Sequence, residues 1–240
     1  MKHAFKLAIS LLIISVCFYF SSCGDDSTDN GTGTGTGSGT GTGGEGNWIP
    51  LTDGSYWKYS GETDITFMGL PVHIKLEYTL RVVRDTLVEG STICKIVDET
   101  EIITTNFSGN TYIDTIYDHD YIGKDNTYYR SKGDDESTNF SDWEGFFECT
   151  PKQGDSWQCD PQDPDYTARI LSFETVTNKT GKGNDFTNCA KTEYVTEGEE
   201  NTYAWYCKDI GIVKQSAIYT LEESSEKKVV TLDLIEYEVK

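Results

Sequence analysis

The feature that most constrains the fold is a strict alternation of apolar and polar side chains over residues 72–82. Apolar residues occupy every even position from Val72 to Val82, and polar or charged residues stand between them. Successive side chains of a β-strand point to opposite faces, so this pattern predicts a long strand with one buried and one solvated face. A turn at Glu89-Gly90 and an Ile-, Val- and Thr-rich run over 91–105 predict that the next strand pairs with it as a hairpin.

Strand signals recur along the rest of the chain, and no window shows sustained helical periodicity with caps. We therefore expect residues 47–240 to form a single all-β domain of roughly ten strands, an antiparallel meander curled into a half-barrel, barrel or sandwich. Loops are expected over 118–126 and 132–142, and irregular structure over 146–164, where prolines are spread. The remaining predicted strands begin at Tyr56 or cover 111–117, 127–131, 166–177, 188–196, 202–208, 211–221 and 228–239.

The first residues have the three parts of an export signal. Lys2 and Lys6 form a short basic start, residues 7–20 are an apolar run, and small residues follow. The run is shorter than the ~20 residues that a helix needs to cross a ~30 Å hydrocarbon core. We therefore expect residues 1–22 to be a signal peptide that is removed, and not a membrane span.

The end of this segment, Phe20-Ser21-Ser22-Cys23, resembles the lipobox of bacterial lipoproteins. The resemblance implies that Cys23 becomes the new N-terminus and carries diacylglycerol and an N-acyl chain such as palmitate. Each buried methylene contributes ~0.8 kcal/mol, so two or three chains hold a protein stably at a membrane surface. Gly24 follows the cysteine where the family's inner-membrane retention signal has Asp, which implies the outer membrane, on either its periplasmic or its surface face. The alternative is an ordinary signal peptide with an incidental cysteine.

Composition changes sharply after the cysteine. Residues 24–46 contain no large apolar side chain, and 31–44 are nearly pure Gly-Thr repeat, which predicts a disordered tether over 23–46. Removal of Lys2 and Lys6 with the signal changes the formal charge from −20 to −22. Nucleic acid is therefore excluded as a partner, because its binding depends on basic side chains, and direct attraction to anionic lipid head groups is not expected either.

The folded part retains five of the seven cysteines. In an exported chain we expect two disulfides and one free thiol. Cys189 and Cys207 are placed symmetrically about Gly198, so a hairpin centred there predicts that they face each other closely enough to bond.

The other three cysteines complete this assignment. Cys149 and Cys159 flank a loop with Pro and Gly, and a disulfide between them is predicted to contribute about 3 kcal/mol. Cys94 lies in an apolar strand and is the expected buried free thiol. Zinc is disfavoured, since Cys-x-x-Cys does not occur and only two histidines follow the signal.

The sequence offers little catalytic chemistry. His73 stands on the polar face of the long strand, and the segment Asp118-His119-Asp120 fails the Ca²⁺-loop pattern because Ile122 and Tyr129 occupy ligand positions. Neither a Gly-x-Ser-x-Gly elbow nor a His-Glu-x-x-His helix occurs. With 40 acidic residues, a close pair of carboxylates is expected by chance. We therefore expect no catalytic, metal or cofactor site.

Two short stretches resemble a group of uncharacterised bacterial lipoproteins that share a "PL..G..W.Y" opening and a "G.VK" close. The opening matches Pro50-Leu51, Gly54 and Tyr56-Trp57-Lys58-Tyr59, and the close matches Gly211-Ile212-Val213-Lys214. The resemblance implies a β-rich, half-barrel-like domain in a lipoprotein. It supplies no catalytic residue.

These observations favour a lipid-anchored envelope protein with a non-enzymatic domain that binds a protein or glycan or has a structural role. One alternative is a carrier of an apolar ligand or lipid in the curled sheet. Another is a hydrolase of envelope polysaccharide, which would need two carboxylates facing each other ~5–9.5 Å apart in an open cleft.

Overall fold

The computed structural model describes residues 47–86, 88, 93–132, 139–220 and 227–240. The predicted signal peptide, the lipid site at Cys23 and the Gly/Thr tether lie outside these residues. The described chain forms one 12-stranded sheet and a single turn of 3-10 helix. The elements are β1 (Tyr56–Phe67), β2 (Leu70–Asp85), β3 (Ile93–Phe107), β4 (Asn110–Lys124), β5 (Tyr128–Lys132), η1 (Phe140–Asp142), β6 (Glu144–Glu148), β7 (Ser156–Asp160), β8 (Asp163–Val176), β9 (Phe186–Val195), β10 (Thr202–Cys207), β11 (Gly211–Thr220) and β12 (Lys227–Glu238).

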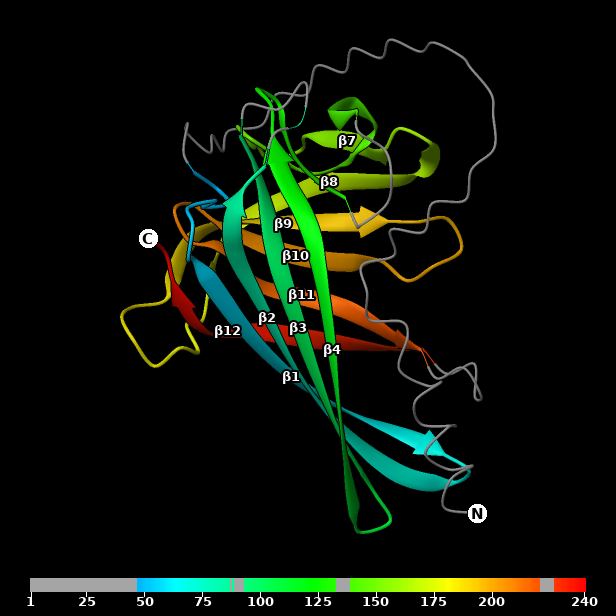
Figure 1. The fold of residues 1–240 in the computed structure, drawn as a ribbon. Helices are drawn as coiled ribbons and strands as arrows, with labels where there is room; N and C mark the ends of the chain where they lie inside the picture. The colour runs from blue at the N-terminus through cyan, green and yellow to red at the C-terminus, as the bar shows by residue number, and fades with distance from the viewer. Residues whose placement is uncertain (1–46, 87, 89–92, 133–138, 221–226) are drawn as a thin grey trace.

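The sheet is an antiparallel meander that curls into a nearly closed barrel (Figure 1). β1 pairs with both β2 and β12, so the two halves of the meander join there, and the sheet ends at β6 and β7. Side chains bridge this seam: Trp157 Nε1 donates to Gly145 O at 2.6 Å, and Tyr194 Oη donates to Phe146 O at 2.7 Å. The predicted all-β antiparallel meander is confirmed, in its barrel-like form.

The predicted hairpin is also confirmed. β2 and β3 pair from Val72↔Phe107 to Asp85↔Lys95, with one irregularity after Val82. The alternation works as expected, since Val72, Ile74, Leu76 and Val82 are buried and the residues between them are not.

Two predictions about loops were wrong. β4 continues to Lys124 through the expected loop at 118–126, and β6 and β7 lie in the region expected to be irregular. In the upper part of β4, the positions on the core-facing side of the sheet hold Asp118 and Asp120. The alternation of apolar and polar residues that identifies a strand is therefore missing there. β6 and β7 have only five residues each, which is too short to show a period.

The lower halves of β1–β4 extend away from the other strands as two neighbouring hairpins, at the bottom of Figure 1. β12 pairs with β1 only along Tyr56–Ser60, and β5 pairs with β4 only along Tyr121–Lys124. We call the projecting part, residues 61–77 and 102–117, the arm. Its two turns contain Met68-Gly69 and Ser108-Gly109, all at positive φ.

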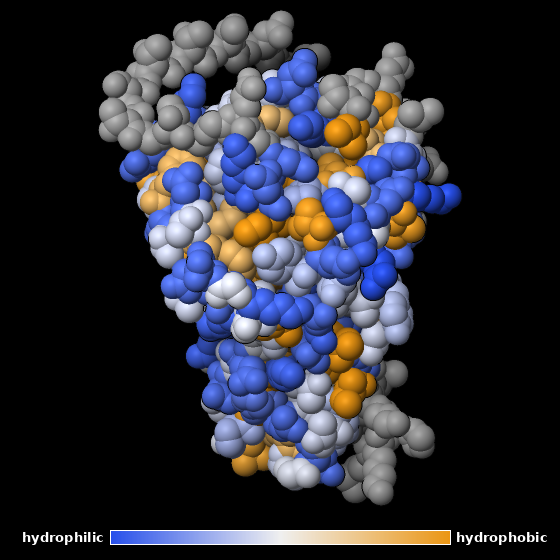
Figure 2. All heavy atoms as spheres, turned by 90° about the vertical axis from the view of Figure 1, so that its left-hand side faces the viewer, coloured by the Kyte–Doolittle hydropathy of each residue, from blue (hydrophilic) through white to orange (hydrophobic). Residues whose placement is uncertain are grey.

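Aromatic side chains fill the middle of the barrel. Trp48 packs on Phe147 and Phe173 with ring centroids 5.7 and 6.2 Å apart, and Phe147 stacks on Tyr206 at 3.9 Å. The face in Figure 2 is mainly hydrophilic, with hydrophobic side chains in small groups. Among the described residues, no helix has the length and apolar character needed to cross a bilayer.

A candidate binding site on the inner face

Acidic side chains occupy core-facing positions on β3 and β4. Glu99 lies opposite Asp118, and Asp120 lies opposite the buried Val97. Directly paired residues share a face of the sheet, and every second residue of a strand shares it too, so Glu99 and Asp120 point into the barrel, whereas Asp118 shares their face of the sheet and is exposed. Glu101, two residues after Glu99, is only 9% exposed.

Two of these carboxyl groups form a close pair. Glu99 and Asp120 are within hydrogen-bonding reach of each other. Burial and the neighbouring Asp120 charge raise the pKa of Glu99 to about 8, while burial and Asp118 raise the pKa of Asp120 to about 6. The pair therefore holds a proton at neutral pH. The Tyr78 hydroxyl is buried within hydrogen-bonding reach of Glu99, which opposes the rise in the pKa of that carboxyl.

A further carboxyl comes from β6. Glu144 pairs with the buried Ser131 and therefore faces inward. Burial, with the charges of Asp160, Asp120 and Asp163, raises the pKa of Glu144 to about 9. Its Oε2 is buried without a hydrogen-bond partner among the described residues. We call Glu99, Glu101, Asp118, Asp120 and Glu144 the inner acidic cluster.

Tyrosines from β8–β10 lie next to the Glu144 end of this cluster. Tyr166 is close to Glu144 and to the buried thiol of Cys159. The hydroxyls of Tyr194 and Tyr206 are 2.6 Å apart, and burial raises the pKa of all three tyrosines above the ordinary value. The carboxyl of Glu144 therefore lies next to a group of neutral tyrosine hydroxyls near the β6/β7 seam.

This arrangement is suited to hydrogen bonding. A protonated carboxyl both donates and accepts hydrogen bonds, as does a tyrosine hydroxyl, so these side chains could bind the hydroxyl groups of a sugar. When the carboxyls are ionised, they could instead bind an amine. Burial also raises the pKa of Glu101, to about 7. Within the described ranges, no three His, Cys, Asp or Glu side chains converge to hold a metal ion.

The two histidines lie on the other face of the sheet from the buried carboxyls. His73 is on the solvated face, where its Nδ1 is 3.0 Å from Asp64 Oδ1. His119, expected in a loop, is instead on the outer face of β4, with its ring against that of Tyr121. Its backbone N–H donates to Asp118 Oδ1 at 2.8 Å.

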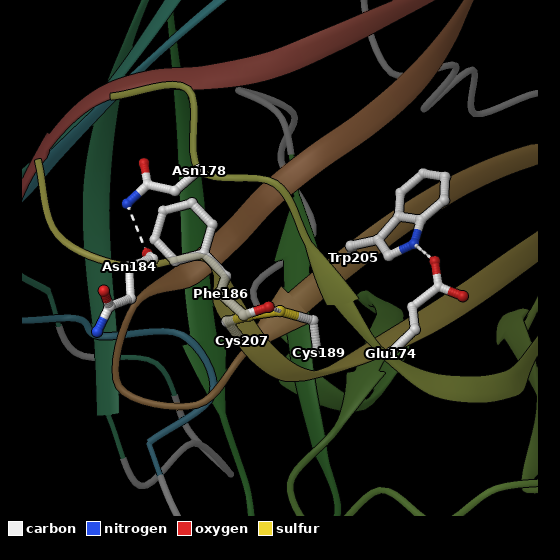
Figure 3. Close-up of a disulfide and its surroundings, with 7 residues drawn as sticks. All are labelled: Glu174, Asn178, Asn184, Phe186, Cys189, Trp205 and Cys207. Atoms are coloured by element: carbon white, nitrogen blue, oxygen red, sulfur yellow. Dashed lines mark hydrogen bonds between the residues drawn. A yellow bond between two sulfur atoms is a disulfide. The ribbon is translucent and has the colours of Figure 1, made fainter. Parts of the chain in front are cut away.

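The structure joins Cys189 and Cys207 in a disulfide across β9 and β10, as the hairpin symmetry predicts (Figure 3). The pairing Tyr206↔Ala190 continues to these cysteines, whose Cα atoms are 4.3 Å apart. Gly198 lies at the centre of the turn with φ +81°.

The predicted disulfide between Cys149 and Cys159 is not formed. Cys149 follows β6 and its Sγ faces Asp125 O at 3.6 Å, whereas Cys159 is buried beside Glu144 at the start of β6. Strands rise ~3.3 Å per residue, so roughly 16 Å of chain separates these two neighbourhoods. Cys94 is a buried free thiol, as expected, and burial raises its pKa to about 11.

The residues that carried the family resemblance meet inside the barrel. Trp57 Nε1 donates to Ile210 O at 2.5 Å, and Tyr59 Oη donates to Ile212 O at 3.0 Å. Gly211 allows this approach, since a Cβ there would lie 3.3 Å from Trp57 Nε1 and 3.6 Å from Pro50 Cδ. We call this group, Pro50, Trp57, Tyr59 and residues 210–212, the Trp57 contact. It packs β1 against the β10–β11 turn.

A concavity lies beside the disulfide, with Cys207 in its lining. Asn178 organises the loop before β9, donating to Lys182 O and Asn184 O at 2.7 and 2.9 Å, and Figure 3 shows it beside Phe186. The loop borders an open polar pocket of about 280 Å³. The loop sequence has no apolar periodicity, so the pocket could not be predicted from it.

The inner acidic cluster was also missed, because acids are so abundant that no pair stood out. One signal was available: Glu99 and Glu101 continue the core-facing positions of Val97 and Ile103. An acid at a core-facing position of a regular strand indicates a buried carboxyl.

Comparison with known proteins adds little. No family model and no curated protein matches the chain. A solved structure that is similar is that of a "putative lipoprotein" from Parabacteroides distasonis ATCC 8503, with 14% identity, a TM-score of 0.33, and coverage of 80% of this chain and 98% of that one. A similarity of this size establishes neither a shared fold nor a shared function.

Proposed function

We propose that the chain is a bacterial cell-envelope lipoprotein, anchored in the outer membrane by lipid on Cys23. The observation that carries this is a cysteine placed directly between an apolar signal and a Gly/Thr tether. The test is the intact mass of the protein from its native membrane, together with fractionation of Cys23→Ala. A mass of Cys23–Lys240 plus acyl chains, and release of the variant from the membrane, support the anchor. An unlipidated mass for the native protein contradicts it.

We further propose that the domain is a non-enzymatic binding module whose ligand contacts the inner acidic cluster. A buried polar atom without a partner costs roughly 1–3 kcal/mol, and Glu144 Oε2 is in this condition among the described residues. An unsatisfied buried group is one of the features by which a functional site departs from the rest of a fold. A ligand with hydroxyl or amine groups would supply the missing hydrogen bonds.

The Glu99–Asp120 pair does not fit the hydrolase alternative, because its two carboxyls are within hydrogen-bonding reach of each other, closer than the ~5 Å that the carboxyls of a retaining glycosidase require. A carrier of an apolar ligand needs an apolar cavity, whereas here aromatic rings fill the middle of the barrel and the groups beside them are polar.

Two probes separate the ligand classes. The purified protein is titrated with cellohexaose, a neutral oligosaccharide, and with spermidine, a polyamine, while tryptophan fluorescence is recorded. Glu99→Gln preserves neutral hydrogen bonding and Glu99→Leu removes it. Binding that survives Gln but not Leu indicates a hydroxyl ligand, and binding lost in both indicates a cation. If both variants bind either probe like the wild type, the cluster is not the site.

A further inference from the structure

The open pocket beside the disulfide lies at the strand ends next to the loop between β8 and β9. Its lining comes from that loop, the start of β9, the β10–β11 turn and Tyr237 near the end of β12. Ligand sites of β-barrels lie preferentially at their mouths, where strand ends and loops surround a concave space. We call this concavity the Asn178 pocket.

Hydrogen bonds within the loop fix the shape of the pocket wall. Asn178 Nδ2 donates to Lys182 O and Asn184 O, and Asn178 Oδ1 accepts the N–H and the hydroxyl of Thr180 at 2.9 and 2.7 Å. The Cys189–Cys207 disulfide holds the strands behind the loop. A wall that is ordered before binding loses little conformational freedom when a ligand binds, which favours affinity.

The exposed lining offers hydrogen-bonding groups that the loop does not use in this way. The carbonyl of Asn184 accepts from Asn178, but its side-chain amide makes neither of these bonds and turns away from Asn178 in Figure 3. Thr187, in the second position of β9, adds an exposed hydroxyl group. Amides and hydroxyls both donate and accept, so they match the hydroxyl groups of a sugar.

Two aromatic rings form the apolar part of the lining. Phe186 is buried and Tyr237 is half-buried, and their rings meet edge to face with centroids 6.2 Å apart. An aromatic ring offers a flat apolar surface to the C–H groups of a sugar. The volume of about 280 Å³ is just below the ~300–1,000 Å³ of sites for drug-sized ligands, so it suits roughly one sugar ring.

The charge of the lining differs in sign from that of the chain. The chain has a formal charge of −20, yet the lining has two lysines, Lys182 and Lys208, and one acid, Asp185. Asp185 Oδ1 accepts the N–H of Asn178 at 3.0 Å and so takes part in the loop. A local excess of positive charge in a concave site attracts anions. The lining therefore favours an anionic ligand over a neutral one.

We propose that the Asn178 pocket binds a single acidic sugar residue, a hexuronate, with its ring against Tyr237 and its carboxylate at Lys182. This site is separate from the inner acidic cluster. Two residues in register stand between Tyr237 on β12 and Glu99 on β3, so three strand spacings, or roughly 14 Å of sheet, separate them.

Two matched sugars test the choice of ligand. The purified full-length protein is titrated with methyl β-D-glucuronide and with methyl β-D-glucoside, and saturation-transfer difference NMR measures binding. The two probes differ only in a carboxylate against a hydroxymethyl group, so the glucuronide should bind about tenfold more tightly at low salt. Sodium acetate, which has the carboxylate without the ring, should bind more weakly than the glucuronide.

A pair of lysine variants tests the location. Lys182→Gln should weaken glucuronide binding about fivefold, and Lys182→Arg, which keeps the charge, should retain most of it. Lys179→Gln is the matched control, because it makes the same change in the same loop. Lys179 Nζ lies 2.6 Å from Asp233 Oδ2 and is not part of the lining, so this variant should bind within about twofold of the wild type.

Each opposite result overturns the proposal. Equal affinity for the glucuronide and the glucoside would show that the lysines do not select an acid. Equal affinity for acetate and the glucuronide would show an anion site without a sugar site. Equal weakening by Lys182→Gln and Lys179→Gln would show that net charge, and not the pocket, decides binding. Absence of saturable glucuronide binding to the wild type also contradicts the site.

Discussion

The Trp57 contact and the inner acidic cluster are both on the inner face of one sheet, and both join strands far apart in sequence. They differ in how their polar atoms are satisfied. In the Trp57 contact, the Trp57 N–H and the Tyr59 hydroxyl each donate to a backbone carbonyl. In the cluster, Glu144 Oε2 is buried without a partner among the described residues. The first region stabilises the barrel, and the second is maintained at a cost in stability.

This difference predicts opposite responses to substitution. Removing a side chain from the Trp57 contact loses burial and leaves a carbonyl unpaired, so it must destabilise. Neutralising a carboxyl in the cluster removes a desolvation penalty, so it should stabilise at a pH where that carboxyl is otherwise forced to ionise.

The largest effect is expected for Trp57→Ala. Trp57 is 4% exposed, and truncating a buried tryptophan typically costs about 3–5 kcal/mol. Urea unfolding followed by circular dichroism measures the change. Trp57→Phe retains most of the ring and loses the hydrogen bond to Ile210 O, so it should cost less. Equal stability of Trp57→Ala and the wild type would show that the contact does not support the barrel.

The disulfide supports the same region, because Cys207 O accepts the N–H of Ile210 at 3.2 Å. Its two cysteines are 18 residues apart, for which the chain-entropy model gives about 3 kcal/mol. The double variant Cys189→Ala, Cys207→Ala should lose about this much stability. Cys94→Ala is the control for loss of a buried sulfur. If reductant lowers the urea midpoint of the double variant as much as that of the wild type, another pair of cysteines is bonded.

The cluster should make stability fall as pH rises. The pKa of Glu144 is raised to about 9 and that of Glu99 to about 8, against ~4.3 for Glu in an unfolded chain. Between these values the native state holds protons that the unfolded state has released. Stability is therefore fully present below pH 4 and is lost as pH rises through 8–9, at no more than about 1.4 kcal/mol per pH unit for each proton. Urea midpoints between pH 5 and 9 measure this slope.

Glu144→Gln isolates one of these protons. The variant should lose part of the slope and be more stable than the wild type at pH 8–9. Asp98→Asn, on the exposed outer face of β3, makes the same change in charge and should leave the slope unchanged. A wild-type profile that rises from pH 5 to 9 would mean that the cluster does not hold protons in the folded protein.

The contrast also explains what the sequence predicted. Strand positions, the β2–β3 hairpin and the bond between Cys189 and Cys207 followed from alternation and turn symmetry, which are local. The Trp57 contact was visible as two motifs, but their meeting depends on closure of the barrel between β1 and β12. The proximity of Glu99 and Asp120 depends on the β3–β4 register, which the sequence does not specify. The upper half of β4 was not predicted as a strand, because acidic residues stand where apolar ones are expected.

The smallest expected effect concerns Gly211 in the Trp57 contact, and it separates the need for a positive φ from the need for space beside the indole. Gly211 has φ +100°, and a Cβ there would lie 3.3 Å from Trp57 Nε1. Gly69, in the β1–β2 turn, has φ +76°, and a Cβ there would meet nothing within 4 Å. Both Gly→Ala changes impose a left-handed conformation on alanine, at roughly 1 kcal/mol. Only Gly211→Ala also displaces the indole, so its loss in urea unfolding should be larger by about 1 kcal/mol. Equal losses would mean that backbone conformation alone requires glycine at 211.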